Sequence, residues 1–290
     1  MNLDRHPNFP SSHVPARNID VWLPPNLDQD SEMRCPVIYM HDGQNLFYPE
    51  ESFIGVDWGI DQAVRGLIDR KEIRPPIVVG IWNTANRVGE YMPELALPTQ
   101  EDREQTASRI KSFPMEISYQ LAGESYLKFI VEELKPWIDL NYPTLPGQPY
   151  TSIMGSSMGG LISLYALCRY PNVFFGAGCL SAAWDIATVS LLPYFESALP
   201  DPSTHRIYMD MGGREFSDPE QDYQLQEIQS AFDHLARRAG YRDNHSLLSL
   251  TFPNHEHSEL FWRARVDIPI QFLLEQGQST HGWENQSPSS

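Results

Sequence analysis

Short apolar runs alternate along this chain with polar stretches that contain glycine and proline. Residues 37–40 and 77–82 are almost continuously apolar, a pattern typical of strands covered on both faces of a parallel sheet. Between them, residues 57–68 carry apolar side chains at helical spacing. The succession of strand, helix and strand predicts a βαβ unit.

The same alternation continues on both sides of this unit and predicts an α/β fold. Residues 18–25 alternate apolar and polar positions and end on prolines, which predicts an outer, half-exposed strand. Pro136 predicts a bend or break in the helix expected near 126–138, and Gly240 is expected to follow the end of a helix over 222–239. The remaining strands are expected at 150–154, 174–180, 206–210 and 247–252, and a closing helix is expected to reach residue 274.

A length of 290 residues fits one α/β domain, 1–290. Within it, residues 84–122 interrupt the pattern with prolines and polar side chains after the end of a strand. Such an excursion is a candidate lid or substrate-recognition insertion, and a simple surface elaboration is the alternative. Residues 276–290 are polar and expected to fray.

One glycine-rich turn stands between an apolar strand and an apolar helix. It reads Gly155-Ser156-Ser157-Met158-Gly159, a G-x-S-x-G match in which the central serine sits on a sharp turn at the carboxyl end of the sheet. The two glycines leave room for the neighbouring strand and the start of the helix, which is expected to have one apolar face. Because the flanks fit the mechanics of this motif, we favour a nucleophilic serine over an ordinary turn.

A serine hydroxyl becomes a strong nucleophile when an imidazole removes its proton and a carboxylate orients that imidazole. α/β-Hydrolases supply these groups in the chain order Ser, Asp or Glu, His. Ser157, Glu215 and His257 follow three successive predicted strands in that order. They are the candidate nucleophile, orienting acid and base.

Other residues near His257 and Glu215 in the sequence could serve as the base or the acid. His255 is the alternative base, and Asp210 and Asp218 are the alternative acids. His255 and His257 resemble a metal pair, but no third ligand stands at a recognisable spacing, so no metal is expected. Glu215 is favoured because it follows the glycine turn expected at residues 211–213, and a solvated loop carboxylate is the alternative reading.

The oxyanion formed during attack needs two backbone N–H donors. Met158, directly after the serine, is expected to provide the first. Gln44, in the loop after the strand 37–40, is expected to provide the second. His41 and Asp42 in the same loop are either catalytic or, as we favour, pin the loop through hydrogen bonds.

Net charge limits the classes of binding partner, and cysteine usage and the N-terminal residues indicate the cellular compartment. The chain has 21 basic and 38 acidic side chains and a formal charge of −17, which disfavours nucleic acid and membrane surfaces as partners. Its three cysteines, Cys35, Cys168 and Cys179, are scattered among apolar neighbours and are expected to be buried free thiols. Residues 1–7 contain no apolar secretory segment, and a cytoplasmic location is expected.

Four ordered stretches between Val14 and Leu274 resemble the serine esterase family that includes enterochelin esterases, feruloyl esterases and the mycolyltransferases of the antigen 85 type. They are Tyr39-Met40-His41-Asp42-Gly43-Gln44-Asn45-Leu46-Phe47, Asn86-Arg87-Val88-Gly89-Glu90-Tyr91-Met92-Pro93, Gly155-Ser156-Ser157-Met158-Gly159-Gly160 and His257-Ser258-Glu259-Leu260-Phe261-Trp262. The resemblance implies an α/β-hydrolase fold, with a mostly parallel central sheet and helices on both faces, and no cofactor.

The resemblance also implies individual roles. Ser157 matches the family's nucleophile, and His257, rather than His255, matches the histidine of its H-x-E-x-x-W pattern. Gln44 falls at the second oxyanion donor. Glu215 falls where the family has a carboxylate after a glycine-threonine turn, but Gly213 replaces the threonine here, and some members use a Ser-His pair alone.

The expected function is hydrolysis of carboxylic esters through an acyl-enzyme. The alternatives are acyl transfer to a sugar or alcohol, and a catalytically silent binding protein with the same fold. The substrate is expected to be a small-molecule ester. The acidic balance disfavours a highly anionic one unless Arg87, Arg214 and Arg263 gather at the pocket.

Overall fold

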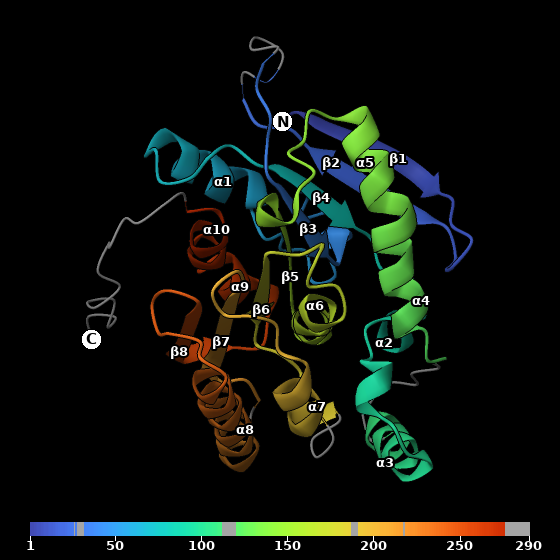
Figure 1. Cartoon of the computed structure of the whole chain (residues 1–290), viewed down its shortest axis with the longest axis vertical. Helices are drawn as coiled ribbons and strands as arrows, with labels where there is room; N and C mark the ends of the chain where they lie inside the picture. Colours follow the sequence, from blue (N-terminus) through green and yellow to red (C-terminus); the bar gives the residue numbers. More distant parts are fainter. Residues whose placement is uncertain (26, 28–31, 112–119, 187–190, 217, 276–290) are drawn as a thin grey trace.

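The computed structural model describes residues 1–25, 27, 32–111, 120–186, 191–216 and 218–275, and centres on one eight-stranded sheet (Figure 1). The strand order is β1-β2-β4-β3-β5-β6-β7-β8. β1 and β2 run antiparallel to their neighbours, and all strands from β4 to β8 in that order run parallel. The strands are β1 (Leu3–Phe9), β2 (Arg17–Trp22), β3 (Val37–His41), β4 (Ile77–Ile81), β5 (Thr151–Ser156), β6 (Gly176–Leu180), β7 (Arg206–Arg214) and β8 (Leu247–Glu256).

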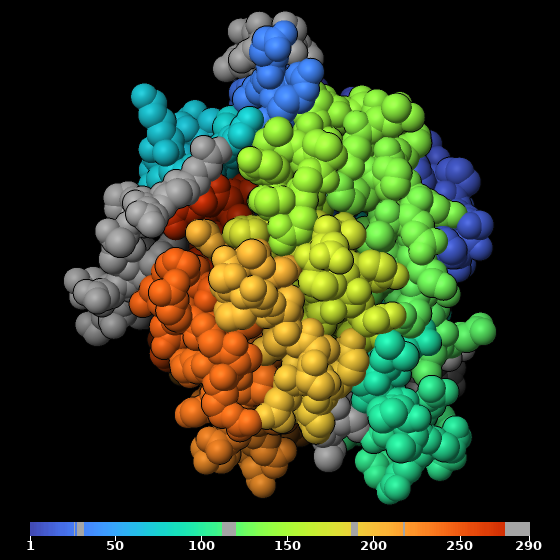
Figure 2. Space-filling view, in the orientation of Figure 1, coloured from blue at the N-terminus to red at the C-terminus, as the bar shows by residue number. Residues whose placement is uncertain are grey.

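Helices cover both faces of this sheet, as the resemblance implies. Successive side chains of a strand point to opposite faces, so Val37 and Tyr39 of β3 join one apolar core and Ile38 and Met40 join the other. The first core is closed by α4 (Gly123–Lys128), α6 (Met158–Arg169), α7 (Leu191–Ala198) and α8 (Pro219–Arg238), and the second by α1 (Ile60–Asp69), α9 (Glu259–Arg263) and α10 (Asp267–Leu274). Figure 2 shows the surface of the first layer, coloured green to orange.

The N-terminal strands correct the expected edge of the sheet. The sequence predicts an outer strand at 18–25, but β2 is the second strand, and all of its residues except half-buried Asn18 are buried. The true edge is β1, which carries mostly exposed and half-buried side chains. The sequence of β1 contains no apolar run by which it could be recognised, because the side chains of an edge strand need not be buried.

Two helices also differ from the sequence pattern. The helix expected at 126–138 is one continuous unit made of α4, a π-helical turn η4 (Phe129–Leu134) and α5 (Lys135–Asn141). The irregular hydrogen bonding lies just before Pro136, which cannot donate within a helix, so the proline perturbs the helix without ending it. In α6 every residue from Met158 to Leu167 is buried, whereas one apolar face is predicted, because neighbouring helices cover its outer side.

The excursion at 84–122 contains more helix than its sequence indicates. It forms α2 (Arg87–Glu90), η3 (Glu94–Ala96) and α3 (Gln100–Lys111), and α3 lies at the lower edge of the molecule in Figures 1 and 2. Arg17 of β2 makes a buried, bidentate ion pair with Glu90, at 2.9 and 2.7 Å, which ties α2 to the sheet. Residues 112–119 lie outside the described residues, and a lid role for 84–122 stays a prediction.

The C-terminal part consists of two helices, α9 and α10, where the sequence predicts one. Gly240, with φ 99°, follows α8 as expected. The tail expected at 276–290 lies outside the described residues, and the single-domain assignment stays a prediction.

No helix in the described part of the chain is long and apolar enough to cross a membrane. Short 3₁₀ helices also form at η2 (Gly43–Asn45), η5 (Gln148–Tyr150) and η6 (Trp184–Ile186).

Candidate active site

The candidate residues lie at the carboxyl ends of neighbouring parallel strands. Ser157 follows β5, Ser181 follows β6, Glu215 follows β7 and His257 is the first residue after β8. Adjacent strands are about 4.8 Å apart. Residues separated by a hundred positions in the sequence are therefore brought to one edge of the sheet, where loops of an open α/β sheet form the ligand crevice.

Ser157 occupies a strained turn between β5 and α6. Its φ and ψ are 56° and −125°, a conformation that costs about 1–3 kcal/mol for a residue with a side chain. A Cβ on Gly155 would lie 2.9 Å from the backbone of Gly159, and a Cβ on Gly159 would lie 3.2 Å from Cβ of His41. The two glycines thus allow strand, helix and the loop after β3 to meet around the serine.

His257 and Glu215 are joined directly. Nδ1 of His257 lies 2.6 Å from Oε2 of Glu215, and the side chains are 25% and 1% exposed, respectively. Oε1 of Glu215 accepts a hydrogen bond from the Ser181 hydroxyl, at 2.7 Å, and one from the Gly212 backbone N–H. Burial raises the pKa of Glu215, but the hydrogen bonds from His257, Ser181 and Gly212 outweigh it and bring that pKa below its usual range.

The competing residues make other contacts. Asp210 is fully buried and forms a bidentate pair with Arg265, at 3.0 and 2.9 Å. Asp218 accepts from the N–H of Glu220 and caps α8. His255 lies with Nδ1 3.0 Å from Nη1 of Arg265. Of the three acids and two histidines considered from the sequence, only Glu215 and His257 are hydrogen-bonded to each other.

The glycine turn expected before Glu215 is not a turn. Gly212 and Gly213 lie within β7, where a Cβ would come within 2.3 Å of the His255 carbonyl oxygen and 2.4 Å of the Pro253 carbonyl oxygen, respectively. In this stretch β7 advances two residues while β8 advances four, from the pair Gly212↔Phe252 to the pair Arg214↔Glu256. Such a bulge redirects side chains, and the glycines let the two backbones approach.

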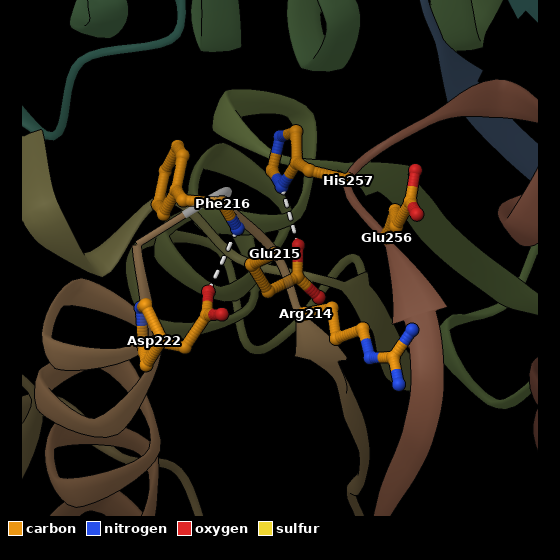
Figure 3. Close-up of a pocket in the computed structure, with 7 residues that line it drawn as sticks. Arg214, Glu215, Phe216, Asp222, Glu256 and His257 are labelled. Carbon is orange, nitrogen blue, oxygen red and sulfur yellow. Dashed lines mark hydrogen bonds and ion pairs between the residues drawn. The ribbon is translucent and has the colours of Figure 1, made fainter.

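A depression of about 500 Å³ opens beside this pair (Figure 3). The Phe216 ring stacks on that of His257, with 6.0 Å between centroids, and Figure 3 shows the Arg214 side chain extending away from the histidine. The residues that line the depression are Arg214, Glu215, Phe216, Pro219, Asp222, Glu256 and His257. Ser157 is not among them. Within the described part of the chain, its hydroxyl makes no hydrogen bond to His257.

The loop after β3, which carries Gln44, is held by an ion pair. Asp42 has a left-handed backbone, φ 56°, and its carboxylate accepts from Arg87 at 2.8 and 2.7 Å and from Asn83 at 2.6 Å. The Gln44 side-chain oxygen accepts from the Asn83 N–H. These contacts fix the loop that carries the Gln44 N–H, while Met158 begins α6 directly after Ser157. Asp42 therefore acts as a loop anchor, the alternative favoured from the sequence.

His41 is buried at the end of β3. Its Nδ1 lies 2.8 Å from the Tyr126 hydroxyl, and its Nε2 is buried without a partner among the described residues. Burial lowers the pKa of His41 to about 3. This histidine is therefore neutral at ordinary pH and cannot shuttle protons near pH 7.

We expect His41 to make folding sensitive to acid. The unfolded chain binds a proton at this histidine below pH 6.5, whereas the folded protein does so only near pH 3. The folded state therefore loses stability as the pH falls through this range, by about 2 kcal/mol at pH 5. Urea unfolding at pH 7 and pH 5 should show a loss about 2 kcal/mol larger in the wild type than in His41→Gln. Equal losses in the two proteins would contradict this assignment.

Packing and pairing also place several other side chains. Trp184 is fully buried and packs against Phe195 and Phe232. Of the three arginines, Arg214 lines the depression beside His257, whereas Arg87 pairs with Asp42 and Arg263 pairs with Asp57 beside α1. The three cysteines are free, and Cys168 is half-buried rather than buried. Among the described residues, no group of three potential ligands could hold a metal ion.

Two residues at this edge, Ser181 and Arg265, escape the sequence reasoning, and Trp262, the last residue of the H-x-E-x-x-W match, makes a contact that the sequence did not indicate. The Trp262 indole N–H and Nη2 of Arg265 both reach the Ser181 hydroxyl, at 3.1 and 2.8 Å. A signal for Ser181 is present in the sequence, because it directly follows a predicted buried strand. Arg265 carries no such signal, since a basic residue near a helix end is usually solvated.

The parallel sheet, the helices on both faces and the strained serine at a strand-to-helix turn define an α/β-hydrolase fold. Residues 14–266 match the profile of the family described as "Putative esterase", and the chain belongs to this family. It is accordingly a carboxylic ester hydrolase. A curated relative, "Uncharacterized protein YbbA" of Bacillus subtilis (strain 168), is 23% identical over 266 residues, which cover 91% of this chain and 95% of the relative.

Solved structures agree in fold. An IroE-like serine hydrolase from Shewanella oneidensis superposes with a TM-score of 0.72 at 20% identity, covering 94% of this chain and 80% of the other. A ferulic acid esterase gives 0.66 at 16% identity, covering 94% and 97%. The enterochelin esterase of Shigella flexneri gives 0.65 at 17% identity, and this chain, 94% covered, spans 58% of it. These likenesses confirm the α/β-hydrolase fold.

Proposed function

We propose that this esterase works through an acyl-enzyme formed on Ser157. His257 is the general base and acid, and Glu215 orients it. The backbone N–H groups of Met158 and Gln44 form the oxyanion hole. The substrate is a small-molecule carboxylic ester, in line with the names of the ferulic acid and enterochelin esterases of similar fold.

The observation that carries this proposal is the 2.6 Å contact between Nδ1 of His257 and Oε2 of Glu215. An ionised carboxylate only accepts hydrogen bonds, so Nδ1 carries the proton of the neutral imidazole. Nε2 is then left with a free lone pair. That tautomer is the one that can take a proton from a serine hydroxyl.

The proposed reaction has two halves. The Ser157 oxygen attacks the ester carbonyl while its proton passes to Nε2 of His257, and the negative charge on the carbonyl oxygen is held by the two backbone donors. The C–O bond to the alcohol then breaks, and His257 returns the proton to the leaving oxygen. In the second half, water replaces the alcohol and the same transfers release the acid and regenerate Ser157.

Strain supports the nucleophile assignment independently. Ser157 keeps a positive φ although serine gains nothing from this conformation in a purely structural turn, where glycine is favoured. Strained residues concentrate at functional sites. The cytoplasmic location, the exclusion of nucleic acid and membranes as partners, and the lid role of 84–122 stay predictions from the sequence.

A fluorophosphonate probe tests the proposal. We expect the probe to label the folded protein once per chain, on the peptide that contains Ser157, because only an activated serine reacts at a useful rate. Heat-denatured protein serves as the control and should not react. A short p-nitrophenyl ester should compete with labelling. Absence of labelling in folded protein would contradict the proposal and favour a silent binding protein, and labelling at another residue would refute Ser157.

A further inference from the structure

Ser181 lies between the strands that carry the proposed nucleophile and the orienting acid. It directly follows β6, is 1% exposed and has a left-handed backbone with φ 42°. Its hydroxyl oxygen lies 2.7 Å from Oε1 of Glu215, 3.1 Å from Nε1 of Trp262 and 2.8 Å from Nη2 of Arg265. A serine hydroxyl can make at most three such bonds, as one donor and two acceptors.

Chemistry fixes the direction of all three bonds. An indole N–H and a guanidinium can only donate, so Trp262 and Arg265 occupy both acceptor positions of the Ser181 oxygen. The hydroxyl proton remains, and Glu215 is the one neighbour of the three that can accept it. The Ser181 hydroxyl is therefore locked with its proton toward Oε1 of Glu215.

Arg265 cannot swing away from this position. It is 1% exposed, and its Nε and Nη2 bond both oxygens of Asp210, at 3.0 and 2.9 Å. Its Nη1 lies 3.0 Å from Nδ1 of His255, so that ring nitrogen accepts. Asp210 is held in turn by the Tyr208 hydroxyl, at 2.7 Å. Since every part of the guanidinium is bonded, the donor to Ser181 has one orientation.

We propose that Ser181, oriented by Arg265 and Trp262, is a positioning residue. It keeps the Glu215 carboxylate ionised and turned so that Oε2 faces His257. This inference rests on the proposed function of the Ser157–His257–Glu215 set. Two donors, the Ser181 hydroxyl and the Gly212 N–H, converge on Oε1. They leave Oε2 free to face the imidazole.

The charges around Glu215 agree with this role. Burial raises the pKa of Glu215, and the hydrogen bond from Ser181 is one of the contacts that lower it. Among the described residues, the other ionisable groups that act on this site include His257 and His255 of the β8 end, Arg265 after α9 and Asp185 of η6. Loss of the Ser181 hydroxyl therefore raises the pKa of Glu215. As the pH falls, activity that needs ionised Glu215 is then lost at a higher pH than in the wild type.

The test compares Ser181→Gly with Ser181→Ala. Both remove the hydroxyl, but glycine also relieves the positive φ, so a shared effect cannot come from backbone strain. We expect kcat for a short p-nitrophenyl ester to fall about 10- to 100-fold in both, as for loss of a hydrogen bond to a charged group. KM should change little, and the acid limb of kcat/KM should move to higher pH. Ser163→Ala is the matched control, because that buried hydroxyl bonds the Gly159 carbonyl oxygen instead.

Trp262→Phe provides a second test, because it keeps an aromatic ring next to His257. In the wild type the centroids of the Trp262 and His257 rings are 4.9 Å apart. With one of its two donors gone, the Ser181 hydroxyl is less firmly directed, so we expect a smaller fall in kcat with the same direction of pH shift. If a folded Ser181→Gly protein kept the wild-type kcat and pH profile, the inference would be overturned. The same holds if both Ser181 variants failed to fold and Trp262→Phe showed no pH shift.

The two proposals fail in different ways. If Ser157→Ala remained fully active, the catalytic set itself would be wrong and the Ser181 role would lose its basis. If Ser157 proved essential while Ser181→Gly behaved as wild type, only the positioning role would be refuted.

Discussion

Replacing Ser157 with alanine should lower kcat for a short p-nitrophenyl ester by about 10⁴- to 10⁶-fold, with little change in KM. Alanine keeps the Cβ and the strained turn but removes the oxygen that forms the acyl-enzyme. The residual rate would come from the oxyanion donors and substrate binding alone. Steady-state kinetics at pH 8 measures the effect, with active-site titration to exclude traces of wild-type enzyme.

The adjacent serine provides the control. Ser156 ends β5, is buried and lies next to Ser157 in the same turn, yet its side chain has no part in the proposed chemistry. Ser156→Ala should retain activity. Ser157→Gly should be inactive but at least as stable as the wild type, because glycine adopts the positive φ without strain. Hydrolysis by Ser157→Ala at the wild-type rate would remove the acyl-enzyme from consideration.

Replacing Glu215 with glutamine should lower kcat by about 10³- to 10⁴-fold through the tautomer of His257. Two donors meet at Oε1, the Ser181 hydroxyl and the Gly212 N–H. The glutamine carbonyl oxygen must therefore take that position, which turns the NH₂ group toward Nδ1 of His257. Nδ1 then has to accept, the imidazole proton moves to Nε2, and the histidine can no longer take a proton from Ser157.

The size of this effect distinguishes the three acids considered from the sequence. Asp218→Asn is the matched control, because Asp218 is an exposed cap of α8, and its activity should be unchanged. Asp210→Asn should mainly lower stability, since Asp210 is buried and paired with Arg265. A Glu215→Gln enzyme with near wild-type kcat would mean that His257 works without an orienting acid.

Local patterns explain why much of the fold was predictable. Buried strands of a parallel sheet are mostly apolar, and β4 and all of β3 except its last residue follow that rule. The G-x-S-x-G turn is equally local, because both glycines and the serine belong to one strand-to-helix junction. The pattern missed β1 and misread β2 as an edge, because which strand covers which is a matter of pairing between distant segments.

The sequence by itself determined the α/β class, the order of the strands along the chain and Ser157 at a tight turn, since these depend on residues within a few positions of one another. Only the tertiary structure decided which carboxylate meets His257, and it brought Ser181 and Arg265 to that carboxylate. The physical reason is that such contacts form across strands β6 to β8, where side chains 34 to 84 positions apart become hydrogen-bonded neighbours.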